Sequence, residues 1–298
     1  MMHTGKLQPD NIVTQPVKAA WLQEKSVELY VLRLDKIHAV VSGNKWFKLK
    51  HYLQDAVEKQ CKHIATFGGA WSNHIVATAY AAMQQNLSST GIIRGEEPAI
   101  YSNTLQQAKL FGMQLHFVSR EAYRNKELIK RDFPGGYFIN EGGYGPPGAK
   151  GAAEILEHAA NPGCYTHIFC AVGTGTMLAG LSLAVQPHQQ LTGISVLKNN
   201  TTLYSEVLAL SGKNNFTILH DYSFGGYARH TPQLLAYMTD VWNRYHVPTD
   251  IVYTSKTFYA IEHLVTTNQV PKGAKILMVH SGGLQGNLSL PAGALPFL

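Results

Sequence analysis

The sequence predicts an α/β protein built on mostly parallel sheets that helices cover on both faces. Two observations lead to this prediction. Three segments share the order of an apolar run followed by a glycine turn, and only 15% of the 298 residues are charged while 45% are apolar. Strands that alternate with helices form parallel sheets through right-handed crossovers. Such strands are buried on both faces and carry few charges, so the composition also excludes a coiled coil or a long disordered tail.

The repeated units predict where the functional site lies. In open α/β sheets, ligands bind at the carboxyl ends of the strands, so we expect the glycine turns to share one edge. Helix-like runs follow the first two turns, at residues 75–85 and 177–185. The apolar runs are residues 63–67, 166–172 and 276–280, and the turns after them are residues 68–73, 173–176 and 281–283.

The remaining apolar patterns complete the predicted layers. Apolar residues at helical spacing predict amphipathic helices at residues 46–57 and 234–245. No repeat, low-complexity tract or long linker interrupts the chain. Further strands are predicted at residues 28–34, 89–94, 114–118, 137–140 and 192–197.

The charge pattern favours a small ligand over nucleic acid. The net charge is +6, from 25 Lys and Arg against 19 Asp and Glu. The basic residues are dispersed, and no run of five or six like charges occurs. We therefore expect no nucleic-acid partner, whereas an anionic small molecule suits a mildly basic protein.

The three cysteines argue against a disulfide framework and for a reducing compartment. Cys164, His167 and Cys170 are spaced by three residues, but no second cluster accompanies them. We therefore expect no metal site, and instead predict buried thiols on a core strand at residues 165–172.

Nothing in the apolar pattern indicates a secreted or membrane protein. Residues 1–6 lead into polar sequence and not into an apolar signal region. Residues 168–197 contain no Asp, Glu, Lys or Arg, but glycines, threonines and glutamines interrupt them, so we expect a strand, a loop and a helix here and no membrane span. The expected location is the cytoplasm.

Two familiar enzyme patterns fit the chain poorly. Gly173, Gly175 and Gly180 imitate a nicotinamide fingerprint, but the acid expected about 20 residues later is absent at residues 198–200. Ser42 and Lys45 match S-x-x-K, yet the supporting hydrolase motifs are absent. The turn at residues 173–176 can cradle a phosphate at the start of a helix, but taken alone it is equally a tight strand–helix turn.

A set of short motifs in a fixed order is more specific than any of these patterns. They include Gly-Asn-Lys at residues 43–45, Lys-Leu at 48–49, Ser-Asn-His at 72–74, Ile-Arg-Gly-Glu-Glu-Pro at 93–98, Glu-Gly-Gly at 141–143, Gly-Thr-Gly-Thr at 173–176, Ala-Gly at 179–180, Gly-Tyr at 226–227, Val-Tyr-Thr-x-Lys at 252–256 and His-Ser-Gly-Gly at 280–283. Over roughly residues 28–290 this order resembles the pyridoxal-phosphate enzymes that comprise 1-aminocyclopropane-1-carboxylate deaminase and D-cysteine desulfhydrase.

The resemblance implies a fold and an assembly. The fold would be of the tryptophan-synthase-β type, fold type II, with two domains that each hold a mostly parallel sheet flanked by helices. The expected cofactor domain comprises residues 1–49 and 156–298, and the expected small inserted α/β domain comprises residues 50–155. The family also implies a homodimer with pyridoxal 5′-phosphate as cofactor and a small amino acid as substrate.

The resemblance also assigns roles to individual residues. Lys45 matches the lysine that forms the Schiff base with the cofactor and then moves the substrate's α-proton. Asn73 matches the partner of the cofactor's phenolic oxygen. Residues 72–74 begin a helix whose free N–H groups favour a substrate carboxylate, and Ser72 is expected to take part in catalysis. Two tyrosines, Tyr227 and Tyr253, are expected acids or bases near the substrate. The expected phosphate loop comprises Gly173, Thr174, Gly175 and Thr176.

Three positions bear on the choice of reaction. Thr254 matches the partner of the cofactor's pyridine nitrogen, where cyclopropane-opening enzymes are expected to have glutamate. A neutral hydroxyl gives a weaker electron sink, which favours α,β-elimination to a 2-keto acid and ammonia, as in D-cysteine desulfhydrase. The alternatives are 1-aminocyclopropane-1-carboxylate deaminase activity, or a catalytically silent binding protein on the same fold. His74 replaces a family glutamine and Tyr144 a family serine, so both are expected at the substrate pocket.

Overall fold

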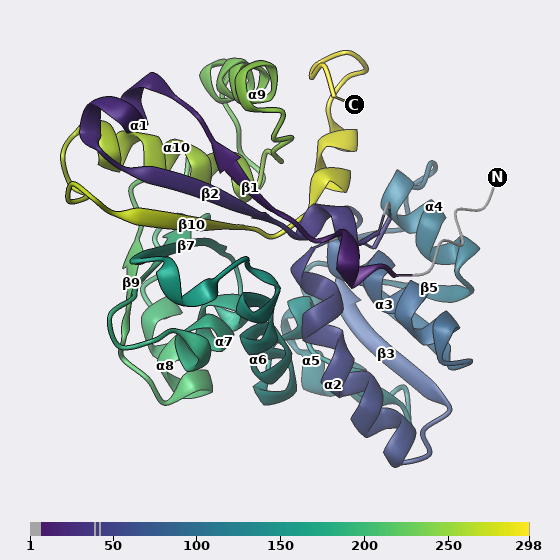
Figure 1. Ribbon diagram of the computed structural model, residues 1–298. Helices are drawn as coiled ribbons and strands as arrows, with labels where there is room; N and C mark the ends of the chain where they lie inside the picture. Colours follow the sequence, from purple (N-terminus) through teal and green to yellow (C-terminus); the bar gives the residue numbers. More distant parts are fainter. Residues whose placement is uncertain (1–6, 39, 42, 298) are drawn as a thin grey trace.

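The computed structural model describes residues 7–38, 40–41 and 43–297 and confirms the predicted α/β class, with two sheets flanked by helices (Figure 1). Residues 1–6 and Ser42, on which the signal-sequence and hydrolase interpretations depended, lie outside the described residues. Within the described ranges, no helix has both the length and the apolar character needed to cross a membrane.

The larger sheet has the strand order β1-β2-β10-β7-β8-β9. Only the pairing of β1 with β2 is antiparallel, so the interior of the sheet is parallel. Figure 1 shows α1, α9 and α10 on one side of this sheet and α6, α7 and α8 on the other. The strands are β1 Thr14–Val17, β2 Glu28–Arg33, β7 His167–Val172, β8 Gln190–Ser195, β9 Phe216–Leu219 and β10 Lys275–His280.

The smaller sheet has the order β5-β4-β3-β6, and all its pairings are parallel. Its strands are β3 His63–Gly68, β4 Ser88–Arg94, β5 Met113–Val118 and β6 Tyr137–Ile139. The helices of the chain are α1 Ala20–Lys25, α2 Asn44–Glu58, α3 Asn73–Gln84, α4 Asn103–Leu110, α5 Lys126–Lys130, α6 Pro146–Ala153, α7 Thr176–Ala184, α8 Leu203–Ser211, α9 Pro232–Tyr245 and α10 Thr254–Thr266.

The low charge of the chain reflects strands that are covered on both faces. Every residue of β7 is buried. Ile168 and Cys170 face a core shared with α6 and α7, whereas Phe169 packs into a second core with α1 and α10. Each such strand removes apolar surface from water on both faces, at about 25 cal/mol per Å². A charge on β7 would have no solvated side on which to lie.

All four strands of the small sheet fall within residues 50–155, whereas the strands of the large sheet fall outside that range. Helix α2 nevertheless runs unbroken across the expected boundary between residues 49 and 50 and packs closely against α6. We keep the division into a cofactor domain and an inserted domain as a proposal, with α2 shared between them.

The structure corrects three details of the sequence interpretation. Strand β8 ends two residues earlier than predicted, because the Ser195 hydroxyl bonds both the N–H and the carbonyl of Leu197 and turns the chain. Cys164 is exposed in a short turn before β7, so only Cys170 is the predicted buried thiol on that strand. Strands β1 and β9 were not predicted; both are four residues long and lie at the edges of the large sheet.

Candidate active site

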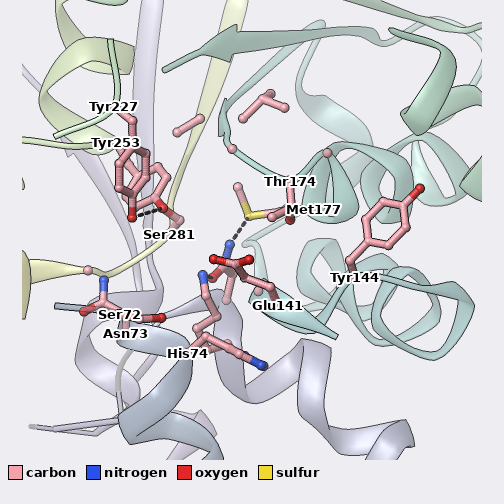
Figure 2. A pocket seen from close by; sticks show the side chains of 18 of the residues that line it. Ser72, Asn73, His74, Glu141, Tyr144, Thr174, Met177, Tyr227, Tyr253 and Ser281 are labelled. Carbon is pink, nitrogen blue, oxygen red and sulfur yellow. Dashed lines mark hydrogen bonds between the residues drawn. The ribbon is translucent and has the colours of Figure 1, made fainter. Parts of the chain in front are cut away.

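One cavity of about 970 Å³ is lined by residues from both halves of the chain. Its walls come from the turns after β3, β7 and β10 and from the start of α2. The sequence predicted that the three glycine turns share one sheet edge, but β3 belongs to the small sheet and β7 and β10 belong to the large one. The turns therefore meet at the cavity from the carboxyl ends of strands in two sheets. Figure 2 shows Tyr227 and Tyr253 together on one side of the cavity, with Thr174 and Met177 across from them.

The start of α2 is fixed against the turn after β10. Gly43 has φ +77°, and a Cβ on it would lie 1.9 Å from the carbonyl oxygen of Ser281, so only glycine fits. The N–H of Asn44 donates to that same carbonyl oxygen at 3.1 Å. The next residue is Lys45, whose side chain enters the cavity. Helix α2 therefore begins where Lys45 lines the same cavity as the three turns.

The surroundings of the Lys45 amine favour its neutral, reactive form. Its Nζ donates to Asn44 Oδ1 at 3.0 Å and lies 5.9 Å from the ring centroid of Tyr253. Burial lowers the pKa of Lys45 to about 8, although the Asp250 carboxylate acts in the opposite direction. A neutral amine is both a nucleophile and a base, and a pKa near 8 keeps a sizeable neutral fraction at physiological pH.

Residues 72–74 form the start of α3 beside this amine. Ser72 is the N-cap residue, and its side chain makes no capping hydrogen bond. The first N–H groups of a helix have no partner within the helix and carry its positive end. Asn73 Oδ1 is buried and has no hydrogen-bond partner among the residues that the structure describes. This end of α3 can therefore receive an anionic or polar group from the cavity.

His74 is part of the same wall but is tied to the sheet. Its Nε2 is 2.8 Å from Thr66 Oγ1, and its buried Nδ1 has no partner within the described part of the chain. Burial, together with two nearby lysine ammoniums, lowers the pKa of His74 well below its ordinary value. The imidazole is therefore neutral, and since the Thr66 hydroxyl donates to Ile139 O, His74 Nε2 carries the proton and Nδ1 is the unprotonated acceptor.

The turn between β7 and α7 faces the cavity mainly through its backbone. Gly175 is the N-cap of α7 with φ +78°, and a Cβ on it would lie 2.8 Å from Val207. The Thr174 and Thr176 hydroxyls lie 3.1 Å apart, but Thr176 is buried and only residues 173–175 line the cavity. The free N–H groups at the start of α7 suit a phosphate dianion.

The two predicted tyrosines meet at the cavity. Tyr253 Oη donates to Tyr227 Oη at 3.4 Å, and their ring centroids lie 6.1 Å apart at 75° (Figure 2). Loss of water contact raises the pKa of both hydroxyls, that of Tyr253 well above its ordinary value, although the Tyr227 residue as a whole is 48% exposed. Both phenols are therefore protonated at neutral pH and can donate hydrogen bonds near the Lys45 amine.

The structure places Thr254 away from the cavity. Its hydroxyl donates to Asp250 Oδ1 at 2.7 Å and accepts from the Asp250 N–H at 2.7 Å. The Asp250 carboxylate also accepts the N–H groups of Val252, Tyr253 and Thr254. Thr254 is buried and is not among the lining residues, whereas the neighbouring Ser281 is.

Tyr144 lines the cavity but at its edge. Figure 2 shows its ring apart from the other labelled side chains, and its carbonyl oxygen accepts from the Tyr52 hydroxyl at 2.6 Å. The sequence interpretation did not assign roles to Lys48, Ser281 or the ion pair of Lys126 with Glu141 (2.7 Å), all of which line the cavity. Lys48, Glu141 and Ser281 lie within quoted motifs, so their positions were a usable signal, whereas no motif or turn in the sequence pointed to Lys126.

The donors present fit pyridoxal phosphate. An amine of lowered pKa can hold an aldehyde, the amide N–H groups of the β7–α7 turn can hold a phosphate, and the cavity-lining Asn73 can donate from its amide Nδ2 to a ring oxygen. Together with two mostly parallel sheets on either side of the lysine, this donor set defines a pyridoxal-phosphate enzyme of fold type II.

Comparison with known proteins agrees. Residues 8–282 match the family described as pyridoxal-phosphate dependent enzyme, and the chain belongs to that family. It is 30% identical over 295 residues to the mitochondrial bifunctional D-cysteine desulfhydrase/1-aminocyclopropane-1-carboxylate deaminase of Arabidopsis thaliana, covering 87% of this chain and 73% of that protein. It is 23% identical over 284 residues to the D-cysteine desulfhydrase of Salmonella typhi, covering 86% and 87%.

The solved structures lead to the same fold. A crystal structure described as an ACC (1-aminocyclopropane-1-carboxylate) deaminase homologue superposes with a TM-score of 0.81 at 26% identity, covering 98% of this chain and 95% of that one.

Proposed function

We propose that this protein is a pyridoxal-phosphate-dependent lyase that acts on a small amino acid by α,β-elimination, in the manner of a D-cysteine desulfhydrase. With D-cysteine and one water, the products would be pyruvate, ammonia and hydrogen sulfide. The observation that carries the proposal is the Lys45 amine, whose pKa is about 8, in a cavity where two protonated tyrosines meet.

We assign each residue a role according to its position in the cavity. Lys45 Nζ would hold the cofactor and then accept the proton from the substrate's α-carbon. The N–H groups at the start of α3, beside Ser72 and Asn73, would bind the substrate carboxylate, and the turn at residues 173–175 would hold the phosphate. When bound, pyridoxal phosphate supplies a ring that withdraws electrons from the α-carbon.

The tyrosine pair suits the departure of the β-substituent. The raised pKa values of Tyr227 and Tyr253 keep both hydroxyls protonated, and their oxygens lie 3.4 Å apart. A protonated phenol can donate its proton to a leaving thiolate, and the second phenol can stabilise the phenolate that results. His74 would border the substrate as a neutral acceptor.

The surroundings of the pyridine nitrogen favour elimination over ring opening. Because the Thr254 hydroxyl is bonded to Asp250, we now propose Ser281, which lines the cavity, as the nitrogen's partner in place of Thr254. The Asp250 carboxylate already accepts four hydrogen bonds from residues 252–254, so the partner we propose for the nitrogen is a neutral hydroxyl. A neutral partner makes a weaker electron sink, which suffices when the leaving group departs soon after deprotonation.

Ring opening of 1-aminocyclopropane-1-carboxylate to 2-oxobutanoate and ammonia is the second candidate function. The Arabidopsis relative carries both activities in its name, and that relative is 30% identical over most of this chain. A catalytically silent binding protein on the same fold would bind a small molecule in the cavity without converting it.

A keto-acid release screen separates these candidates. The purified protein with added pyridoxal phosphate is incubated with both enantiomers of cysteine, serine and β-chloroalanine, and with the cyclopropane amino acid. The keto acid is identified by mass, sulfide and ammonia are measured, and Lys45→Ala serves as the control. Pyruvate with sulfide from D-cysteine supports the proposal. Release of 2-oxobutanoate alone assigns ring opening, and a colourless or inert protein removes both.

We further propose that the enzyme acts as a homodimer in the cytoplasm. The described cysteines, Cys61, Cys164 and Cys170, are free thiols, which is typical of a reducing compartment. Light scattering coupled to gel filtration tests the dimer, because a monomer of 32.8 kDa would elute with half the mass. Cell fractionation followed by immunodetection tests the location.

A further inference from the structure

Tyr227 follows a strained stretch of backbone. Phe224, Gly225, Gly226 and Ala228 all have positive φ, at 49°, 90°, 118° and 54°. This region of backbone space is unfavourable for residues that carry a side chain, and such strain persists only where the surrounding structure enforces it. The segment at residues 223–229 therefore needs an anchor outside itself.

The anchor is Lys256, the third residue of α10. It is 0% exposed, and its Nζ donates to the carbonyl oxygens of Ser223 and Gly226, both at 2.8 Å. These two carbonyls also close two successive turns, since they accept the N–H groups of Gly226 (3.0 Å) and Arg229 (3.2 Å). One ammonium therefore holds both turns to α10.

Filling space does not require a charge at this position. Burial lowers the pKa of Lys256 to about 8, although Asp250 acts in the opposite direction. An apolar side chain of similar length would fill the same volume without that burial penalty. Phe224 already packs against Tyr259 of α10, with ring centroids 5.0 Å apart. What the ammonium adds is the fixed direction of two carbonyl bonds.

Two oppositely charged side chains near the start of α10 bond the backbone at or beside the two tyrosines. Asp250 accepts the N–H of Tyr253 at 2.9 Å, and Lys256 holds the turn at residues 226–229, which contains Tyr227. We propose that Lys256 is the positioning residue that sets the Tyr227 hydroxyl against Tyr253 in the cavity. Its effect on turnover rests on the proposed function, whereas its effect on the segment at residues 223–229 does not.

Hydrogen exchange in the cofactor-free protein tests the anchor directly. In Lys256→Met we expect amide exchange to rise at least about tenfold within residues 223–229 and to stay unchanged elsewhere. Lys256→Gln keeps N–H donors and should restore part of the protection. The matched control is Lys25→Met, which removes a half-buried lysine that donates one bond to Asn268, far from residues 223–229 in the sequence. Unchanged exchange in both Lys256 variants, or an increase spread over the whole chain, would overturn the proposal.

A double-mutant cycle tests the action through Tyr227. A misplaced catalytic group costs roughly 10- to 100-fold, so we expect kcat to fall by that factor in Lys256→Met with less change in KM. In a Tyr227→Phe background the same substitution should add little further loss. Fully additive losses would overturn the assignment to Tyr227. If no variant and no wild-type sample turns over any amino acid, the proposed function fails, while the exchange result still decides the role of Lys256.

Discussion

The turn at residues 173–176 and the segment at residues 223–229 both border the cavity, and both contain glycines in left-handed backbone. The first runs directly from β7 into α7, so its neighbours in the sequence fix its ends. The second has no strand or helix within it, and a lysine that lies 30 residues beyond Gly226 fixes it. One wall of the cavity, the turn at residues 173–176 (the phosphate wall), is therefore fixed by its neighbours in the sequence. The other, the segment at residues 223–229 together with Tyr253 (the tyrosine wall), depends on a buried lysine that is distant in the sequence.

This difference determines what each wall tolerates. Backbone N–H groups at the start of α7 are present whatever side chains stand at the two threonine positions, so the phosphate wall should accept substitution of Thr174 or Thr176 but not of Gly175, where a Cβ would lie 2.8 Å from Val207. The tyrosine wall relies on side-chain bonds from Asp250 and Lys256, each buried and each with several partners. Removing one of those partners leaves buried polar groups unsatisfied, which is costly.

The largest expected effect comes from the amine that both walls face. Lys45→Ala should reduce kcat/KM by roughly 10³-fold or more, as the loss of a nucleophile does, and should abolish the visible absorption of the bound cofactor. Absorption spectra before and after borohydride reduction, with peptide mapping of the label, provide the measurement. Lys25→Met is the control. A label on another lysine would show that Lys45 is not the residue that binds the cofactor.

The next largest effect is expected in the tyrosine wall. Asp250→Ala leaves the N–H groups of Val252, Tyr253 and Thr254 without their acceptor in a buried site. The free energy of unfolding should fall by about 3 kcal/mol or more. Urea unfolding followed by tryptophan fluorescence measures this loss. Asp250→Asn keeps an acceptor oxygen and should lose less; equal losses in the two variants would show that hydrogen-bond acceptance is not what this carboxylate provides.

The two walls also differ in how well the sequence predicts them. The runs at residues 63–67, 166–172 and 276–280 lie within one residue of β3, β7 and β10, because buried parallel strands are continuous apolar runs closed by glycine. Strands β1 and β9 escaped prediction because each has only four residues and lies at a sheet edge. Pro16 in β1 also lacks the N–H that an interior strand needs.

The roles of side chains follow long-range contacts that no local pattern contains. The sequence interpretation gave Thr254 to the cofactor's ring, whereas its hydroxyl is bonded to Asp250. Lys256 was noted only as the end of a motif, because its partners Ser223 and Gly226 precede it by 33 and 30 residues. Motif order thus located the site, but only the folded chain shows which hydroxyl faces the cavity.

A smaller effect is expected in the phosphate wall. Thr174→Ala removes the hydroxyl that lies 3.1 Å from Thr176 Oγ1 and leaves every backbone N–H in place. The dissociation constant for pyridoxal phosphate should rise less than about tenfold, the equivalent of one ordinary hydrogen bond. Absorbance titration of the cofactor-free protein measures it, with unchanged urea stability as the companion result. A loss as large as that of Asp250→Ala in stability would mean that this wall also depends on its side chains.

The smallest expected effect is the change in cofactor loading rate above pH 8. Only the neutral Lys45 amine can attack the aldehyde, and its pKa is about 8. The loading rate of the cofactor-free protein should therefore rise about tenfold per pH unit below pH 7.5 and change only about twofold between pH 8 and 9.5, where the neutral fraction saturates. Stopped-flow absorbance provides the rate. An unperturbed lysine would keep gaining rate up to about pH 10.5. The same profile in Lys256→Gln would show that the titrating amine is Lys45 and not its buried neighbour, whose pKa is also about 8.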